Sequence, residues 1–165
     1  MDRILVAVDR ADNASEVVAY AVELARSAGG KVRLFHSVVI PPPVPVPGVL
    51  APGAFDGETL YGVTAEWLER LAREVPEGLR DGAVADVGPV VRRLRAEVRS
   101  YAPDLVVIGA HAHGPIARVL GSTAARIVNR IDRPVLVVRP LRPRAPASDG
   151  AGTGSREEPR RSDRA

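Results

Sequence analysis

The sequence predicts a doubly wound α/β domain, in which five mostly parallel strands form one sheet with helices on both faces. Two observations predict this fold class. Short, continuously apolar runs rich in branched side chains, such as residues 4–8 and 105–108, are typical of strands buried on both faces. Segments with apolar residues at helical spacing alternate with these runs, which is the pattern of consecutive βαβ units.

The first βαβ unit is expected within the first 40 residues. A strand at 4–8 is followed by Asn13 and Glu16, which have the spacing of a capping box at the start of a helix. This helix is expected to run to about Ala28, where a pair of glycines ends it. A second strand is expected at 32–39.

Residues 41–57 interrupt the alternation and are expected to form a surface insertion rich in proline and glycine. Five prolines between residues 41 and 47 remove backbone donors and favour extended polyproline geometry. A proline-rich ligand for an SH3-type partner is the alternative interpretation, although no basic residue flanks the segment to orient it.

A helix is expected at 58–75, with Val63 and Trp67 among the apolar residues of its core side. A weak third strand is expected at 79–87. The helix that follows is expected to begin at Pro89, which suits the first helical position because it needs no donor there, and to run to about residue 101.

A strand at 104–108, a helix at 122–131 and a last strand at 134–138 complete the predicted domain, which we expect to span residues 1–140. Beyond it, residues 141–165 contain almost no apolar side chain. Such a segment buries too little surface to offset the entropy of ordering, so we expect a disordered tail.

Composition excludes several classes of function. The chain has no cysteine, which rules out a disulfide scaffold, a thiolate metal site and a cysteine nucleophile. Residues 1–140 carry 17 basic and 16 acidic side chains, so no general nucleic-acid footprint is expected. No apolar stretch is long enough for a signal peptide or a membrane span, and we therefore expect a cytoplasmic protein without membrane contact.

The candidate binding residues follow two of the predicted strands. Ligands of doubly wound sheets bind at the carboxyl ends of strands, where Asp9 and Gly109 stand in this sequence. Gly109 is expected to let a ligand approach the backbone. Gly121, Ser122 and Thr123 would offer free amides and two hydroxyls to an anion at a helix start. An ordinary strand–loop–helix joint with a Ser/Thr cap is the alternative interpretation.

The chain resembles the universal stress protein family over residues 1–140. Several sequence blocks carry the resemblance, in the family's order: ILVAVD at 4–9, LFH at 34–36, APDLVVIGAH at 102–111, GSTA at 121–124 and RPVLVV at 133–138. The resemblance implies a small fold of the adenine-nucleotide alpha-hydrolase-like type and a role in stress survival. It also implies a homodimer joined through the last strand, at Val135, Leu136, Val137 and Val138, whose apolar edge would otherwise stay open.

Many members of this family bind ATP through the pattern Gly-x2-Gly-x9-Gly-Ser/Thr, from which this chain departs. Gly109 matches the first glycine, but Ala112 stands where the second belongs, and the loop to Gly121 is one residue short. Gly114 is the candidate to replace the missing glycine. We therefore predict weak or altered binding of ATP, with Mg²⁺ as the counterion of its phosphates.

The resemblance also places an acidic residue, here Asp9, beside the nucleoside, and Ser37 where an apolar residue commonly lies against the base. The predicted binding residues are Ala7, Asp9, Ser37, Gly109, His111, Ala112, Gly114, Gly121, Ser122 and Thr123. His111 and His113 form an HxH pair, but hydrogen-bonding loop histidines are the simpler interpretation and no metal site is predicted. His36 is expected to be a satisfied, largely buried side chain.

The predicted function is a nucleotide-responsive binding or signalling module. No catalytic residue is predicted, and any ATP hydrolysis is expected to be slow. The alternative is a nucleotide-free dimeric adaptor that acts through protein–protein contacts. Four arginines at 92, 93, 95 and 99 are expected to form the solvated face of a helix, with an acidic partner as the alternative.

Overall fold

A computed structural model describes residues 1–10, 13–40, 57–110 and 121–139. Within them lie, in chain order, β1 (Arg3–Ala7), α1 (Ala14–Ala28), β2 (Lys31–Val38), α2 (Gly57–Ala72), a 3-10 turn (Glu77–Leu79), β3 (Arg80–Val87), α3 (Val90–Tyr101), β4 (Leu105–Gly109), α4 (Ser122–Arg130) and β5 (Val135–Val138). All nine predicted helices and strands are present. The predicted tail and, apart from Gly57, the predicted insertion lie outside the described residues.

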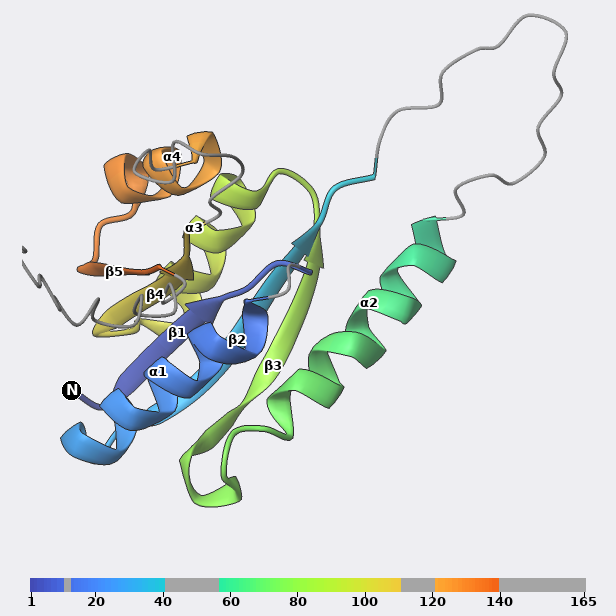
Figure 1. Cartoon of the computed structure of the whole chain (residues 1–165). Coiled ribbons are helices and arrows are strands. Elements are labelled where there is room, and N and C mark those ends of the chain that lie inside the picture. Colours follow the sequence, from blue (N-terminus) through green and yellow to red (C-terminus); the bar gives the residue numbers. More distant parts are fainter. Residues whose placement is uncertain (11–12, 41–56, 111–120, 140–165) are drawn as a thin grey trace, which may run out of the picture.

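The five strands form one parallel sheet in the order β3-β2-β1-β4-β5. At its centre, Val6 of β1 pairs with Leu34 of β2 on one side and with Val107 of β4 on the other. The chain winds outward from β1 to β3, then returns to the other side of β1 (Figure 1). This reversal sets a switch point between the carboxyl ends of β1 and β4, where doubly wound sheets bind ligands.

Helices cover both faces of the sheet, as predicted. Alternate residues of β1 enter different cores because successive strand side chains point to opposite faces. Ile4 and Val6 are fully buried in the core that α1 and α2 close, and Leu5 is buried in the core that α3 and α4 close. Figure 1 shows the first pair of helices in front of the sheet and the second pair behind it.

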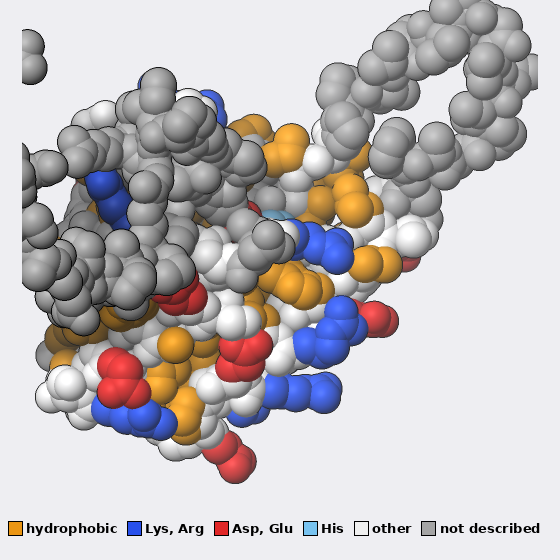
Figure 2. Space-filling model, in the orientation of Figure 1, with side chains coloured by type: hydrophobic (Ala, Val, Ile, Leu, Met, Phe, Trp, Pro, Cys, Tyr) orange, Lys and Arg blue, Asp and Glu red, His pale blue; other side chains and the backbone are white. Residues whose placement is uncertain are grey.

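The α1 and α2 face carries acidic and basic side chains intermixed with apolar ones (Figure 2). On α2, Thr64 is buried while Val63 is 46% exposed, so the expectation that Val63 belongs to the core side is wrong. The helix ends at Ala72, three residues earlier than predicted, yet Val75 in the following turn is fully buried. Trp67 packs against the core while remaining partly exposed.

Two helix starts differ from the prediction. Asn13 precedes α1 but its side chain makes no capping hydrogen bond, so the predicted capping box is not formed. Its backbone has φ −94° and ψ 8°, outside the extended range that a capping side chain requires. Pro89 stands immediately before α3, with φ −60° and ψ 122°, and Val90 takes the first helical position.

At the end of the sheet opposite the switch point, Asp104 links the start of β4 to the start of β1. Its carboxylate accepts the backbone N–H of Asp2 at 2.6 Å and that of Arg3 at 3.0 Å. These two bonds favour the charged form and hold the pKa of Asp104 below its ordinary value. The start of β4 is thereby tied to the start of β1.

A cluster around Arg33 joins β2 to α3. The Arg33 guanidinium lies 4.0 Å from the centre of the Tyr101 ring and forms ion pairs with Glu97 at 3.2 Å and Asp81 at 3.6 Å. Burial, together with the nearby Asp81 carboxylate, raises the pKa of the Tyr101 phenol well above its ordinary value. The Tyr101 hydroxyl has no hydrogen-bond partner among the described residues.

Candidate functional site

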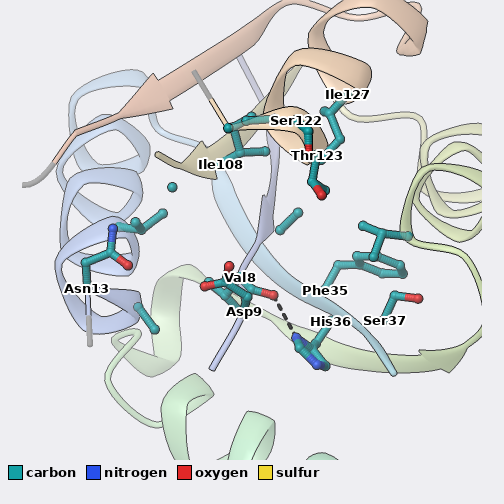
Figure 3. A pocket seen from close by; sticks show the side chains of 17 residues that line it. Val8, Asp9, Asn13, Phe35, His36, Ser37, Ile108, Ser122, Thr123 and Ile127 are labelled. Carbon is teal, nitrogen blue, oxygen red and sulfur yellow. Dashed lines mark hydrogen bonds between the residues drawn. The ribbon is translucent and has the colours of Figure 1, made fainter. Parts of the chain in front are cut away.

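A cavity of about 370 Å³ opens at the switch point, between the carboxyl ends of β1, β2 and β4 and the starts of α1, α3 and α4 (Figure 3). Its apolar lining comprises Ala7, Val8, Ala14, Val17, Phe35, Val90, Ile108, Ala124 and Ile127. Its polar lining comprises Asp9, Asn13, His36, Ser37, Ser122 and Thr123. Four of these nine apolar residues lie in or just after strands and five lie on helices.

Asp9 stands at the mouth of this cleft. Pairing between β1 and β2 continues past Ala7, because the Val8 N–H donates to the Phe35 carbonyl at 3.0 Å. The chain therefore leaves the sheet only at Asp9, whose side chain is exposed at the rim. Asp9 and the start of α4 are far apart in the sequence and line the same cavity, as the sequence analysis expected.

The start of α4 lines the cleft and has no side-chain cap among the described residues. Gly121 is the residue before the helix, with φ −56° and ψ 152°, and no side chain caps the helix. The first N–H groups of a helix have no partner inside it, and no bond from the Ser122 or Thr123 N–H to another described residue is present, so both can serve a ligand. The cap position is occupied by Gly121, so the Ser/Thr cap of the alternative interpretation is not formed.

Arg126 is bound to this helix start. Its Nε donates to the Ser122 carbonyl at 3.2 Å, and its Nη2 donates to the Thr123 hydroxyl at 3.3 Å. The guanidinium thus adds a positive charge one helical turn from the free amides. Positive charge and free amides together suit an anionic group.

At Gly109, α1 packs so closely against the end of β4 that a side chain would be crowded. A Cβ at Gly109 would lie 3.1 Å from the Val17 Cγ2 and 3.4 Å from the Asn13 Nδ2, so α1 occupies the space beside it. The expectation that Gly109 opens the backbone to a ligand is thus incomplete, because at this position the absent side chain admits α1. The same approach brings the Asn13 amide into the cleft (Figure 3). Sequence reasoning assigned Asn13 to a cap and missed this position.

The polar residues that follow β2 are held by the backbone. The His36 Nδ1–H donates to the Val8 carbonyl at 2.8 Å (Figure 3), and its ring meets that of Trp67 edge-on at 5.3 Å. The buried Ser37 donates its hydroxyl to the Gly88 carbonyl at 2.7 Å. His36 is satisfied as expected, although it is only half-buried. Ser37 connects β2 to the turn before α3.

Seven of the ten predicted binding residues line the cleft: Ala7, Asp9, Ser37, Gly109, Gly121, Ser122 and Thr123. The other three, His111, Ala112 and Gly114, lie outside the described residues, as does His113. Phe35, Val90 and Ile127 line the cleft but were not predicted. Phe35 and Val90 stand at a strand end and a helix start that face the switch point, and this topological position is the signal that could have found them.

Within the described ranges, no group of three or more His, Asp or Glu residues is close enough to hold a metal ion. None of the helices in those ranges has the length and apolar character needed to cross a bilayer.

Comparisons with known proteins agree on one family. A sequence model of the universal stress protein family matches residues 1–139. A universal stress protein of Synechocystis sp. is 27% identical over 156 residues, which covers 83% of this chain and 97% of that protein.

Two solved structures have a similar fold. The universal stress protein from Archaeoglobus fulgidus in complex with dAMP aligns with a TM-score of 0.58 and 23% identity, covering 83% of this chain and 97% of that one. A universal stress protein in complex with cAMP aligns with a TM-score of 0.57 and 20% identity, covering 84% and 96%. At these identities the likeness is one of fold.

Proposed function

The chain belongs to the universal stress protein family, and from that premise we propose that it binds an adenine nucleotide in the cleft between Asp9 and the start of α4. One observation carries the proposal. A carboxylate and an uncapped helix start, on opposite sides of the sheet's switch point, line a single cavity with an apolar floor. That cavity, at about 370 Å³, falls within the range of small-molecule sites, roughly 300–1,000 Å³.

Each part of a nucleotide has a chemical counterpart in the cleft. The apolar floor, including Phe35 and Val90, suits the base. The Asp9 carboxylate can accept a hydrogen bond from a ribose hydroxyl. The free amides and hydroxyls of Ser122 and Thr123 suit a phosphate. Two proteins of similar fold, solved with dAMP and with cAMP, support an adenine nucleotide as the ligand.

We propose that binding is weak compared with relatives that keep the complete glycine pattern. Ala112 replaces the second glycine and the loop to Gly121 is one residue short. In addition, the Ser37 hydroxyl already donates to Gly88, and a polar group stands where an apolar contact with the base would be stronger. Mg²⁺ would enter with the phosphates, which are its usual ligands in nucleotide sites.

The proposed role is that of a nucleotide-responsive binding module, with hydrolysis slow or absent. In the described part of the cleft, the side chains beside the start of α4 are hydroxyls and an arginine, which position and neutralise phosphates. Phosphoryl transfer also needs a residue that positions the attacking nucleophile. A cleft that only binds the phosphates does not catalyse hydrolysis.

Equilibrium dialysis with labelled ATP and Mg²⁺ tests this proposal. The purified chain should retain ATP, and Asp9→Asn and the double variant Ser122→Ala/Thr123→Val should each retain several-fold less. Asp2→Asn is the matched control, because Asp2 is an exposed aspartate at the opposite end of β1. No retention by the wild-type chain at millimolar nucleotide, or equal retention by all variants, would overturn the proposal.

A nucleotide-free dimeric adaptor is the second candidate function, and the last strand favours its dimeric part. β5 pairs only with β4 in the described sheet, and Leu136 on it is 38% exposed. An apolar edge strand is a template for pairing with another chain. We propose that two copies join along Val135–Val138.

Sedimentation velocity tests the dimer. The wild-type chain should sediment as a dimer and Leu136→Asp as a folded monomer. Val63→Asp places the same charge on α2, at another exposed apolar position, and should leave the dimer intact. A wild-type chain that stays monomeric at about 100 μM, well above the micromolar range of weak stable dimers, would contradict the proposal.

A further inference from the structure

Five arginines form a groove on the outer side of α3 and α4, away from the sheet. Arg92, Arg95 and Arg99 come from α3, and Arg126 and Arg130 come from α4. Residues at these spacings share one face of a helix, and the two faces meet across a cavity of about 550 Å³. Residues 1–140 are nearly neutral, with 17 basic and 16 acidic side chains, so this grouping is a local concentration of charge.

The groove arginines have few carboxylate partners. Arg95 lies 4.0 Å from the exposed Asp132 carboxylate, at the limit of an ion pair. For Arg92, Arg99 and Arg130, no carboxylate of the described residues lies within ion-pair distance. Like charges held close together repel one another, so a bound anion would stabilise the groove.

Elsewhere in the described chain, three arginines form ion pairs, whereas others, such as Arg70 and Arg73, form none with a described carboxylate. Arg26 contacts Glu23, Arg33 contacts two carboxylates, and Arg93 contacts Asp86 at 3.7 Å. On the α1 and α2 face, acidic and basic side chains are intermixed (Figure 2). The property of the α3–α4 side that carries the argument is thus the gathering of five arginines around one cavity.

The groove adjoins the nucleotide cleft. Val90 and Thr123 line both cavities, so the two spaces meet at the starts of α3 and α4. Arg126 marks the junction, because it lines the groove and donates to the Thr123 hydroxyl. From an anion bound at the start of α4, a row of arginine side chains therefore leads away from the cleft along the groove.

We propose that the α3–α4 groove binds a chain of phosphates. Guanidinium groups recognise phosphate through paired hydrogen bonds, and several in a row match an anion of repeated charge. The arginines of α3 span seven residues, about 10 Å of helix, which is the scale of a short phosphate chain. Among the described residues, the groove lining includes no aromatic side chain that would anchor an acidic protein segment.

The phosphate chain has two chemical sources. One source is the phosphate tail of the nucleotide whose base occupies the cleft, and this possibility rests on the proposed function. The other source is a free inorganic polyphosphate, which is independent of the proposed function. Calorimetric titration of the full chain with AMP, ATP and inorganic tripolyphosphate separates them. The groove variant is Arg92→Gln/Arg99→Gln, because both side chains are exposed and have no carboxylate partner among the described residues.

The matched control is Arg70→Gln/Arg73→Gln, which removes the same charge from exposed positions on and just after α2. Tripolyphosphate should bind the wild-type chain and the control with equal affinity. It should bind the groove variant about tenfold more weakly, which is the scale of losing two solvent-exposed charge contacts. Thermal melting checks that both double variants remain folded.

The ratio of ATP to AMP affinity identifies the source. A ratio that falls in the groove variant supports the nucleotide tail, whereas an unchanged ratio with weakened tripolyphosphate binding supports free polyphosphate. If neither AMP nor ATP binds but tripolyphosphate does so through the arginines, the proposed function fails and the groove site stands. Equal tripolyphosphate binding by all three proteins, or equally tight binding of a hexaglutamate peptide, overturns the phosphate site.

Discussion

Val17 of α1 fills the space that a side chain at Gly109 would need. The Val17 Cγ2 would lie 3.1 Å from a Cβ at Gly109, closer than nearly all real contacts of a Cβ atom. This contact sets the start of α1 against the end of β4, two of the elements that line the cleft.

Gly109→Ala should therefore lower the free energy of unfolding by about 1–3 kcal/mol, the usual cost of overpacking a core. The reason is the crowded Val17 methyl, so Val17→Ala should cost less in the Gly109→Ala background than in the wild type. Urea unfolding of the four proteins of this cycle measures the coupling. Strictly additive effects would show that the two residues do not constrain each other.

Ser37→Ala should destabilise the fold more than it weakens nucleotide binding. The Ser37 hydroxyl donates to the Gly88 carbonyl at 2.7 Å, and its loss leaves that acceptor without this partner, at a cost of about 1 kcal/mol. Ser27→Ala removes an exposed bond within α1 and should cost less. A Ser37→Ala chain of unchanged stability but lost ATP retention would instead assign Ser37 to the ligand.

Asp104→Asn should reduce the acid sensitivity of the fold. The pKa of Asp104 is lowered in the folded state by the N–H groups of Asp2 and Arg3. Its stabilisation is therefore present above the unfolded value of 3.8 and is lost as pH falls through the folded value.

Urea unfolding at pH 7 and at about pH 3, below the unfolded pKa, measures this effect. The Asn variant should be less stable than the wild type at pH 7, and the difference should shrink at the lower pH. A difference that stays constant between the two pH values would exclude this role for the carboxylate.

Tyr101→Phe should protect the fold at alkaline pH. The pKa of the buried Tyr101 is raised in the folded state, so its stabilisation is complete below the unfolded value of 10.0 and decreases as pH rises above it. One such group changes the free energy of unfolding by up to about 1.4 kcal/mol per pH unit. Phe keeps the ring beneath Arg33 without the ionisable hydroxyl.

The two proteins should thus have similar stability at pH 7, while the Phe variant should be the more stable at about pH 11, above the unfolded pKa. Tyr20→Phe is the control, because Tyr20 is 38% exposed on α1. Parallel stability curves for wild type and Tyr101→Phe across this range would show that Tyr101 does not ionise on unfolding.

The sequence was sufficient to predict the four α-helices and five strands of the described residues, but not the 3-10 turn at Glu77–Leu79. Buried parallel strands and amphipathic helices are predictable because they have different periods of apolar residues. The largest discrepancies came where local signals conflict with packing. Asn13 has the residue type and spacing of a cap, but the close approach of α1 to Gly109 turns its amide into the cleft. Val63 continues the apolar period of α2, yet it faces solvent.

The site was predictable where it depended on topology alone. Asp9 and Ser122 could be placed together because they come after β1 and β4, the two strands that flank the switch point. The arginine groove could not, because it needs the relative rotation of α3 and α4, which no periodicity specifies. From the sequence, Arg92 and Arg130 belong to separate solvated faces; in the structure they line one cavity.

The most direct test of the account is a two-dimensional amide NMR titration of the isotope-labelled chain with ATP and Mg²⁺. Binding in the cleft should shift the amides of Asp9, Ser122 and Thr123 together, with one common affinity, and leave those of Asp2 and Asp104 at the opposite end of the sheet unmoved. Shifts confined to that opposite end, or none at saturating nucleotide, would contradict it.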